Sequence, residues 1–204
     1  MLSPETIHTY VDILREELVP ATGCTEPIAI AYAAALLRQT LGAAPERVLA
    51  EVSGNIIKNV KSVIVPNTGG LKGIQAAVAA GVVAGRADQI LQVISDVPED
   101  KLGDIARYAK ETPIQVECAH TPRLLDIVLT GWAGDHTALV HIADSHSNVV
   151  RVERDGQVLR EKALDAAGQA GQERKMSVED ILAVGRAVDP GLGADRVERP
   201  VAVS

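Results

Sequence analysis

Residues 24–42 read Cys-Thr-Glu-Pro-Ile-Ala-Ile-Ala-Tyr-Ala-Ala-Ala-Leu-Leu-Arg-Gln-Thr-Leu-Gly and contain the apolar run from Ile28 to Leu37. Glutamate and proline in the first turn favour a helix that begins at Cys24 or Thr25, and Gly42 is typical of its end. The apolar run is too short to cross a bilayer. We therefore expect a buried helix here.

On either side of this helix, the sequence predicts an α+β fold in which amino-terminal helices pack on a mainly antiparallel sheet. Helical spacing of apolar residues predicts further helices at Pro4–Leu18, Leu71–Val83, Val97–Lys110 and Ser177–Val188. Alternating patterns predict strands at Val48–Ile56, Ile114–Cys118, Leu124–Thr130, Ala138–Ile142, Val149–Arg154 and Gln157–Leu159. The turn signal Asp155-Gly156 predicts that the last two strands form a hairpin.

Composition predicts three parts along the chain. Residues 1–160 are expected to form one α+β domain of a catalytic type. Residues 161–176 are polar and rich in Ala, Gly and Gln, which is typical of a linker. Residues 177–204 are expected to form a short helix, with Ser177 as its cap, and a tail.

The overall composition excludes several classes of function. The chain of 204 residues has no Phe, one Trp and three Tyr, and its formal net charge is −7. Few stacking side chains and a charge that repels phosphates argue against nucleic-acid binding. We see no membrane-spanning run, and no secretory signal in Met1–Thr9. Cys24 and Cys118 are too few for a disulfide framework, so we expect a reduced, cytoplasmic protein.

The segment Gly23-Cys24-Thr25-Glu26-Pro27 is the most informative for chemistry. A thiol in the first turn of a helix sees the positive end of the helix dipole, which favours the thiolate. The same helix start suits a substrate carboxylate. The alternative is a small buried cysteine that only packs beneath the helix.

Three further segments could bind or convert a small ligand. In Ser53–Asn59, two amides, a hydroxyl and an ammonium surround a glycine and could bind a zwitterion, although a plain turn with a solvated Lys58 is the alternative. The Gly-rich loop Pro66–Gly70 could approach an anion, although a plain turn is the alternative; it is not a P-loop, because Lys72 follows too soon. In the turn Ser145–Asn148, a histidine could act as an acid or base, or could simply be a satisfied turn residue.

Taken in order, these segments are similar to the L-cysteine desulfidase family, which is related to the iron–sulfur L-serine dehydratases. The likeness spans roughly residues 16–188. The matching stretches are VPATGCTEPIA (19–29), VSGNIIKN (52–59), VPNTG (65–69) and HSNVV (146–150). The first of these stretches is the most specific.

The resemblance implies a serine-dehydratase-like domain of a carbon–sulfur or carbon–oxygen lyase. Such enzymes use a [4Fe–4S] cluster in a β-elimination that converts the amino acid to pyruvate and ammonia. By position, Cys24 would be the cluster ligand, and Lys58 and His146 would be catalytic. The residues implied to bind substrate are Thr25, Glu26, Ser53, Asn55, Asn59, Thr68, Ser147 and Asn148.

The sequence also departs from the family. Members are longer, and their other cluster cysteines lie in a carboxy-terminal half; Cys118 matches none of these ligands. Asn67 stands where we expect Gly, and Ser147 where we expect Thr. We therefore expect an amino-terminal domain or subunit, or a truncated relative, that is inactive without the cluster-binding half and does not hold the [4Fe–4S] cluster alone. The expected partners are a small amino-acid substrate, a second cluster-bearing subunit or domain, and further copies in a homo-oligomer.

The sequence is also compatible with two other classes of function. One is a non-catalytic domain that binds an amino acid or serves assembly. The other is a cysteine hydrolase with Cys24 as nucleophile, His146 as base and Asn148 as the residue that orients the base. The hydrolase is the weaker alternative because it leaves Lys58 and Thr68 without a role.

Overall fold

The structure of the chain, a computed structural model, describes residues 7, 9, 10, 21, 23–164 and 177–187. It divides into two compact units, one formed by residues 21–170 and the other by residues 1–20 and 171–204. In the part described, no helix is long and apolar enough to cross a membrane.

The larger unit is an α+β fold built on one mixed sheet of six strands in the order β2-β1-β3-β4-β5-β6. Strands β1 and β2 run parallel, and the other four pairings are antiparallel. The strands are β1 (Arg47–Val52), β2 (Ile114–Cys118), β3 (Asp126–Ala133), β4 (His136–Ala143), β5 (Val149–Arg154) and β6 (Gln157–Glu161). The helices are α2 (Thr25–Leu41), α3 (Gly54–Val60), α4 (Gly73–Ala84) and α5 (Leu102–Glu111), with the short 3₁₀ helices η1 (Ala87–Gln92) and η2 (Glu99–Lys101).

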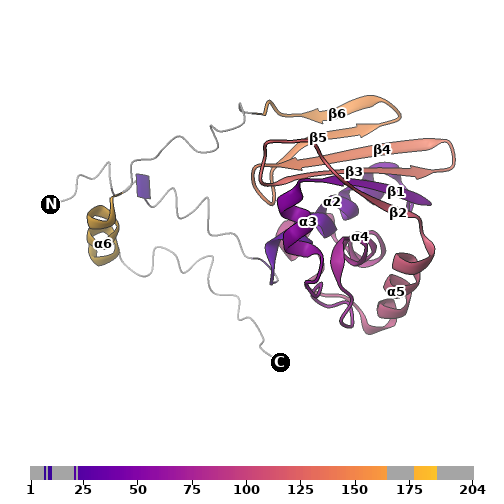
Figure 1. Cartoon of the computed structure of the whole chain (residues 1–204), viewed down its shortest axis with the longest axis horizontal. Helices are drawn as coiled ribbons and strands as arrows, with labels where there is room; N and C mark the ends of the chain where they lie inside the picture. Colours follow the sequence, from indigo (N-terminus) through magenta and orange to yellow (C-terminus); the bar gives the residue numbers. More distant parts are fainter. Residues whose placement is uncertain (1–6, 8, 11–20, 22, 165–176, 188–204) are drawn as a thin grey trace. The chain divides into compact units, whose positions relative to one another are not determined.

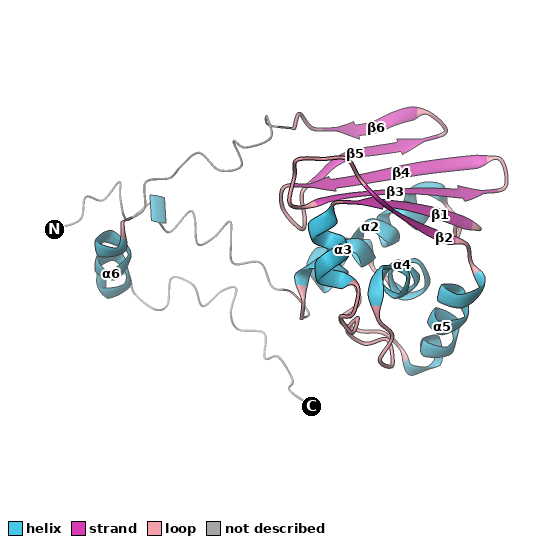
Figure 2. Cartoon of the chain, viewed as in Figure 1, coloured by secondary structure: helices cyan, strands magenta, loops and turns pink. Residues whose placement is uncertain are grey.

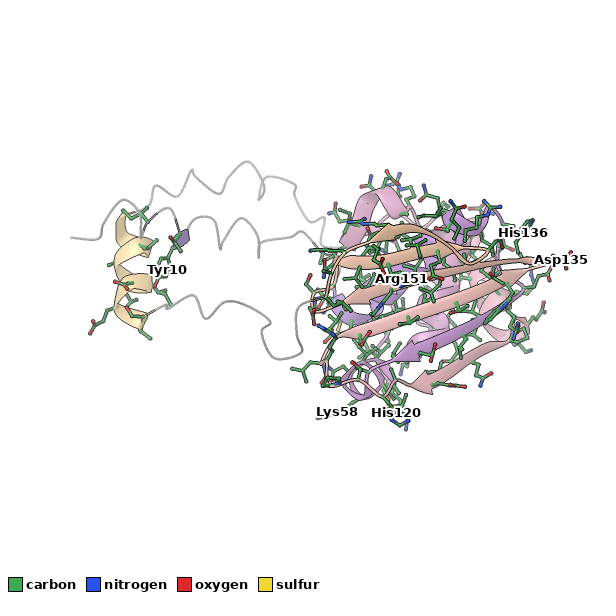
Figure 3. All side chains as sticks on the ribbon, turned by 90° about the horizontal axis from the view of Figure 1, so that it is seen from above. Tyr10, Lys58, His120, Asp135, His136 and Arg151 are labelled. Atoms are coloured by element: carbon green, nitrogen blue, oxygen red, sulfur yellow. The ribbon has the colours of Figure 1, made fainter. Side chains whose placement is uncertain are left out.

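All four α-helices of this unit lie on one face of the sheet (Figures 1 and 2). The sheet therefore has two different faces. On β3, Ile127 and Leu129 point into the core, whereas Val128 and Thr130 are only half-buried on the other face. Figure 3 looks onto this open face, where Arg151 lies. The α+β prediction is thus confirmed, with one face of the sheet covered and one open.

Helix α2 lies at the centre of the core, as the apolar run predicts. Its residues from Pro27 to Ala35 are all buried, and it ends at Gly42, which adopts a left-handed conformation with φ of 84°. Helix α4 packs directly against it: a Cβ built on Gly81 would lie 2.1 Å from the carbonyl oxygen of Ala31. Small side chains therefore let the two helix backbones touch, which explains how a core without phenylalanine is filled.

One predicted element is wrong. The strand expected at Val48–Ile56 ends at Val52, and α3 begins directly afterwards. Ser53 is the N-cap of α3, and its Oγ accepts a hydrogen bond from the backbone N–H of Ile56 at 3.4 Å. The side-chain cap satisfies a free amide of the helix start, which outweighs the strand-like alternation of the sequence.

The strands predicted at Leu124–Thr130 and Ala138–Ile142 are present with different bounds. They form β3 and β4, which pair without interruption from Asp126↔Ala143 to Ala133↔His136. Because of this pairing, both strands extend to the hairpin turn between Ala133 and His136, which the alternation of apolar residues alone did not indicate.

The smaller unit contains α6 (Val178–Ala187). Ser177 caps this helix, because its Oγ accepts a hydrogen bond from the backbone N–H of Asp180 at 3.0 Å, as predicted. Its backbone N–H donates to the hydroxyl of Tyr10 at 3.2 Å. Most of the helix predicted at Pro4–Leu18, most of the predicted linker and the tail after residue 187 lie outside the described residues.

Candidate functional site

The candidate site centres on the carboxylate of Glu26 in the first turn of α2. The thiol of Cys24, the N-cap residue, donates to Oε2 of Glu26 at 3.2 Å, and the hydroxyl of Thr25 donates to the same oxygen at 3.4 Å. From α3, the side-chain amide of Asn59 donates to Oε1 at 3.2 Å. The Glu26 carboxylate thus connects the start of α2 with Asn59, near the end of α3 and 33 residues further along the chain.

The charges in this site depend on one another. Burial alone would raise the pKa of Glu26. The net shift is nevertheless downward, because the carboxylate accepts hydrogen bonds from its own backbone N–H, Cys24 and Asn59 and is attracted by the charge of His146. Burial lowers the pKa of His146, and the Glu26 charge only partly opposes this. The site therefore contains an ionised carboxylate and an imidazole that is neutral at pH 7.

The pKa of the Cys24 thiol is raised, first by burial and then by the hydrogen bond and charge of Glu26. This direction is opposite to the effect expected of the helix start, because the carboxylate stands next to the sulfur. Cys24 is nevertheless exposed, so the protonated thiol is accessible.

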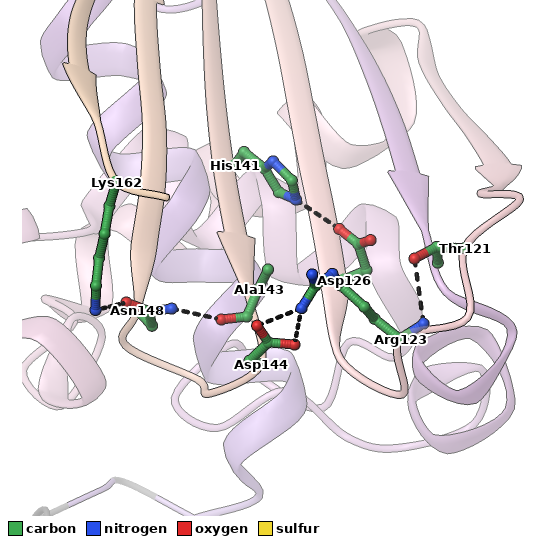
Figure 4. A network of polar contacts seen from close by, with 8 residues as sticks. All are labelled: Thr121, Arg123, Asp126, His141, Ala143, Asp144, Asn148 and Lys162. Carbon is green, nitrogen blue, oxygen red and sulfur yellow. Dashed lines mark hydrogen bonds and ion pairs between the residues drawn. The ribbon is translucent and has the colours of Figure 1, made fainter. Parts of the chain in front are cut away.

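His146 lies in a tight turn between β4 and β5. The backbone N–H of Ala143 donates to the carbonyl of Asn148 at 3.2 Å, and the Asn148 amide donates to the Ala143 carbonyl at 2.9 Å. The Asn148 oxygen accepts from the ammonium of Lys162 at 2.8 Å (Figure 4). The side chain of Asn148 therefore closes the turn, whereas the sequence suggested that it orients the imidazole.

A second network lies beside this turn (Figure 4). Arg123 forms an ion pair with Asp144, and Nε2 of His141 lies 2.6 Å from Oδ1 of Asp126. Burial raises the pKa of Asp126, but His141, Thr121 and Arg123 lower it, so that the net shift is downward.

The other residues predicted in the Ser53–Asn59 segment lie around α3. Ser53 is buried, and its hydroxyl donates to the carbonyl of Leu124 at 2.7 Å, so it serves the helix start. Asn55 and Lys58 are exposed; Figure 3 shows Lys58 at the edge of the unit. Asn55 is one helical turn from Asn59 and so lies on the same side of α3.

The Gly-rich loop adjoins the start of α2, because a Cβ built on Gly23 would lie 3.1 Å from the ring of Pro66. Thr68 is buried, and its hydroxyl donates to the carbonyl of Val65 at 2.7 Å, within the loop itself. Asn67 has a left-handed backbone with φ of 56°, and its amide donates to the carbonyls of Ile94 and Ser95. Because asparagine tolerates this conformation better than most residues, it can stand where we expected glycine.

The Glu26 carboxylate thus interacts with four other predicted site residues: it accepts hydrogen bonds from Cys24, Thr25 and Asn59, and it interacts with His146 through its charge. Ser53 and Thr68 use their hydroxyls in local structure, and Ser147 is half-buried in the turn of His146. Sequence reasoning missed the neighbouring polar residues Thr121, Arg123, Asp126, His141, Asp144 and Lys162. No local motif marks these residues; only the pairing of β4 with β3 and with β5 brings these parts of the chain together.

The ligands for a metal are incomplete. Among the described residues, no three His, Cys, Asp or Glu side chains gather in a way that could hold a metal ion. Cys24 offers one thiol, and Cys118 lies beside the start of α3, where its sulfur is 3.8 Å from a Cβ built on Gly54. The described residues therefore do not fit a whole iron–sulfur cluster, which needs three or four thiolates.

A separate open hollow of about 430 Å³ lies between α2, α4 and α5. Three of its charged side chains are engaged in local contacts: Arg38 donates to the carbonyls of Val82 and Gly85 at 2.8 Å, and Arg107 pairs with Asp104. Arg38 satisfies backbone carbonyls at the end of α4, and the Arg107–Asp104 pair lies within α5. The hollow is therefore a weaker candidate than the Glu26 site.

The fold and the site define an α+β domain with a half-buried carboxylate, an exposed thiol and a half-buried imidazole around the start of its central helix. The chain is 50% identical over 176 residues to a UPF0597 protein of Desulfitobacterium hafniense, and the match covers 85% of this chain and 41% of that relative. It is 44% identical over 176 residues to a UPF0597 protein of Treponema denticola, covering 85% and 41%. It is 39% identical over 180 residues to one of Lachnoclostridium phytofermentans, covering 88% and 43%.

The chain therefore spans about two fifths of the length of the curated relatives it matches. The names of these relatives state no activity and give no link to L-cysteine desulfidases or L-serine dehydratases. No family model matches the chain. No solved structure matches it either.

Proposed function

We propose that the chain is the amino-terminal, substrate-side domain or subunit of an iron–sulfur-dependent L-cysteine desulfidase or L-serine dehydratase. The observation that carries the proposal is the carboxylate of Glu26, which binds Cys24 and Asn59 and acts electrostatically on His146. These residues come from three of the segments in which the sequence resembles that family. In this proposal the α+β unit is a serine-dehydratase-like domain.

The proposed reaction is a β-elimination. His146 accepts the proton from Cα of the substrate, and the electron pair of the Cα–H bond forms a double bond to Cβ. The Cβ–S or Cβ–O bond breaks, and its electron pair leaves with the heteroatom as hydrosulfide or hydroxide. The aminoacrylate that is released hydrolyses to pyruvate and ammonia. The lowered pKa of His146 suits this role, because the imidazole is neutral and ready to accept a proton at pH 7.

The other residues of the site would bind the zwitterionic amino acid. The ionised carboxylate of Glu26 attracts an α-ammonium group, and the amides of Asn55 and Asn59 with the ammonium of Lys58 suit an α-carboxylate. Lys58 is exposed, so it could reach a substrate at the rim of the site.

In the complete enzyme, Cys24 would be one ligand of the [4Fe–4S] cluster, and the remaining ligands would come from a second subunit or domain. The chain's coverage of about two fifths of its relatives, 41% in the first case, supports such a missing part. Metal binding at Cys24 would displace the thiol proton that Glu26 stabilises. A homo-oligomer in the reducing cytoplasm is part of the same proposal.

Of the two alternatives, a cysteine hydrolase has less support. The partner of the Cys24 thiol is Glu26, which raises its pKa and disfavours the nucleophilic thiolate. Asn148, the residue that would orient the base, bonds to Ala143 and Lys162. A non-catalytic amino-acid-binding domain would keep the site but turn over no substrate.

The proposal is tested with the chain joined to the remainder of the Desulfitobacterium hafniense relative and purified without air. His146→Gln should lower the rate of pyruvate formation from L-cysteine or L-serine by about 10²–10⁴-fold, the usual contribution of a general base. His136→Gln is the matched control, because His136 is the first residue of β4 and contacts Asp155. Equal activity of the two variants would remove His146 from the mechanism; binding of the amino acid without pyruvate would favour the binding domain.

A further inference from the structure

The turn that carries His146 begins at Asp144, and the carboxylate of Asp144 forms an ion pair with Arg123, which precedes β3. We propose that these two residues are positioning residues: together they set where the imidazole of His146 lies relative to Glu26 and Asn59. The effect of these residues on catalysis rests on the proposed function, whereas their effect on the position of the His146 ring does not depend on it.

Asp144 is the first residue of the turn and has an unusual backbone. Its φ of 67° is left-handed, a conformation that only a few per cent of residues other than glycine adopt. Two contacts hold it there: its backbone N–H donates to the carbonyl of Leu125 at 3.0 Å, and its carboxylate binds the Arg123 guanidinium. The direction in which the chain leaves β4 towards His146 therefore depends on residues 123–125.

The side chains of the ion pair are partly sheltered from solvent. The side chains of Arg123 and Asp144 are 12% and 26% exposed, so water screens their attraction less than it does at the open surface. The backbone N–H of Arg123 donates to the Thr121 hydroxyl at 3.2 Å, which fixes the local chain. Such a pair can hold a defined geometry, unlike a fully exposed one.

The same segment also holds the helix that carries Asn59. The hydroxyl of Ser53, the N-cap of α3, donates to the carbonyl of Leu124 at 2.7 Å, and its backbone N–H donates to the carbonyl of Asp126 at 2.9 Å. Residues 123–126 thus contact both the start of α3 and the turn that carries His146. Asn59 and His146, both of which act on Glu26, are placed by one stretch of chain.

At its other end the turn is closed by Asn148, which binds the Ala143 carbonyl and Lys162. The turn is therefore fixed at both ends, with His146 between them. Loss of the Arg123–Asp144 pair should release the first end only, so the turn should loosen around His146 while β4 and β5 stay paired.

The test is an NMR experiment on the chain as it stands, with ¹³C-labelled histidine, at pH 8, where the His146 ring is neutral. The His146 ring signal is assigned by its loss in His146→Gln. Asp144→Asn removes the charge but keeps a residue that tolerates the left-handed backbone, and Arg123→Gln removes the partner. Both variants should shift or broaden the His146 signal, and Arg123→Lys should restore it in part because it keeps the charge.

The matched control is Asp155→Asn in the hairpin turn of β5 and β6. Asp155 also has a left-handed backbone, with φ of 51°, and its carboxylate also binds a histidine and a backbone N–H, those of His136 and Thr137. This variant should leave the His146 signal unchanged. An unchanged His146 signal in both Asp144→Asn and Arg123→Gln, or an equal change in the control, would overturn the inference.

Activity supplies a second readout. In the chain completed with the remainder of the relative, Arg123→Gln should lower kcat by about ten- to a hundredfold, as expected for a misplaced catalytic group, with KM little changed. The NMR experiment needs no turnover, so it tests the positioning role by itself. The assay for pyruvate formation tests the proposed function separately.

Discussion

The packing of α4 on α2 allows a quantitative prediction, because it positions the helix that begins at Cys24. In Gly81→Ala, the new Cβ would lie 2.1 Å from the carbonyl oxygen of Ala31 and 2.8 Å from the Cβ of Ala34. A carbon and a carbonyl oxygen normally approach to about 3.3 Å, so the helices must separate by roughly 1 Å. The obstacle is backbone, which cannot rotate away.

The magnitude follows from two opposing effects. Overpacking of a tight core costs up to about 3 kcal/mol, whereas alanine is favoured over glycine in a helix by about 1 kcal/mol. We expect Gly81→Ala to lower the free energy of unfolding by about 2 kcal/mol, which is a fall of about 4–8 °C in Tm for a domain of this size. Urea and thermal unfolding followed by circular dichroism measure both values.

Gly103→Ala is the matched control for this prediction. Gly103 lies in α5, and a Cβ built on it would meet nothing within 4 Å. The same substitution should therefore stabilise the chain there by up to about 1 kcal/mol. If Gly81→Ala proves as stable as the original chain, the close contact of α2 and α4 is not real.

Three further predictions concern the site and its supports. Glu26→Gln should lower the pKa of the Cys24 thiol, because it removes the neighbouring charge. Alkylation of Cys24, measured in a Cys118→Ala background, should therefore become faster at pH 7–8. An unchanged pH profile of alkylation would contradict the account. Ser53→Ala should cost about 1–2 kcal/mol in urea unfolding, since α3 loses its cap and the Leu124 carbonyl loses its donor. The lowered pKa of Asp126 means that its carboxylate contributes stability that is fully present above its ordinary pKa and is lost as the pH falls through the lowered folded value. Asp126→Asn should therefore flatten the loss of stability on acidification below about pH 4, and an equally steep loss in the variant would disprove this contribution.

The sequence was sufficient for those parts of the fold that local pattern determines. The apolar run and Gly42 predicted α2 and its end, and the hairpin signal Asp155-Gly156 predicted the turn between β5 and β6. The short helix α3 was missed, because the residues around Ser53 alternate like a strand and only the side-chain cap reveals the helix. The prediction failed where a single side-chain cap decides between two local structures.

The site was predictable only in part for the same reason. Cys24, Glu26, Asn59 and His146 were found from their residue types and the motifs around them. The ion pair of Arg123 and Asp144 could not be found, because it depends on the register of β3 and β4. The effect of Glu26 on the Cys24 thiol was also missed, since the expected helix-dipole effect ignored a neighbouring carboxylate whose orientation only the structure provides.

The most direct test of the central claim is anaerobic analysis of iron, sulfide and pyruvate formation, with the chain alone and with the chain completed by the remainder of its relative. The account predicts that the chain alone stays colourless and inactive, and that the completed protein is brown, contains close to four irons per chain as a [4Fe–4S] cluster requires, and forms pyruvate from L-cysteine or L-serine. A completed protein that binds no iron and forms no pyruvate would contradict the account, and a cluster held by the chain alone would refute the need for a second half.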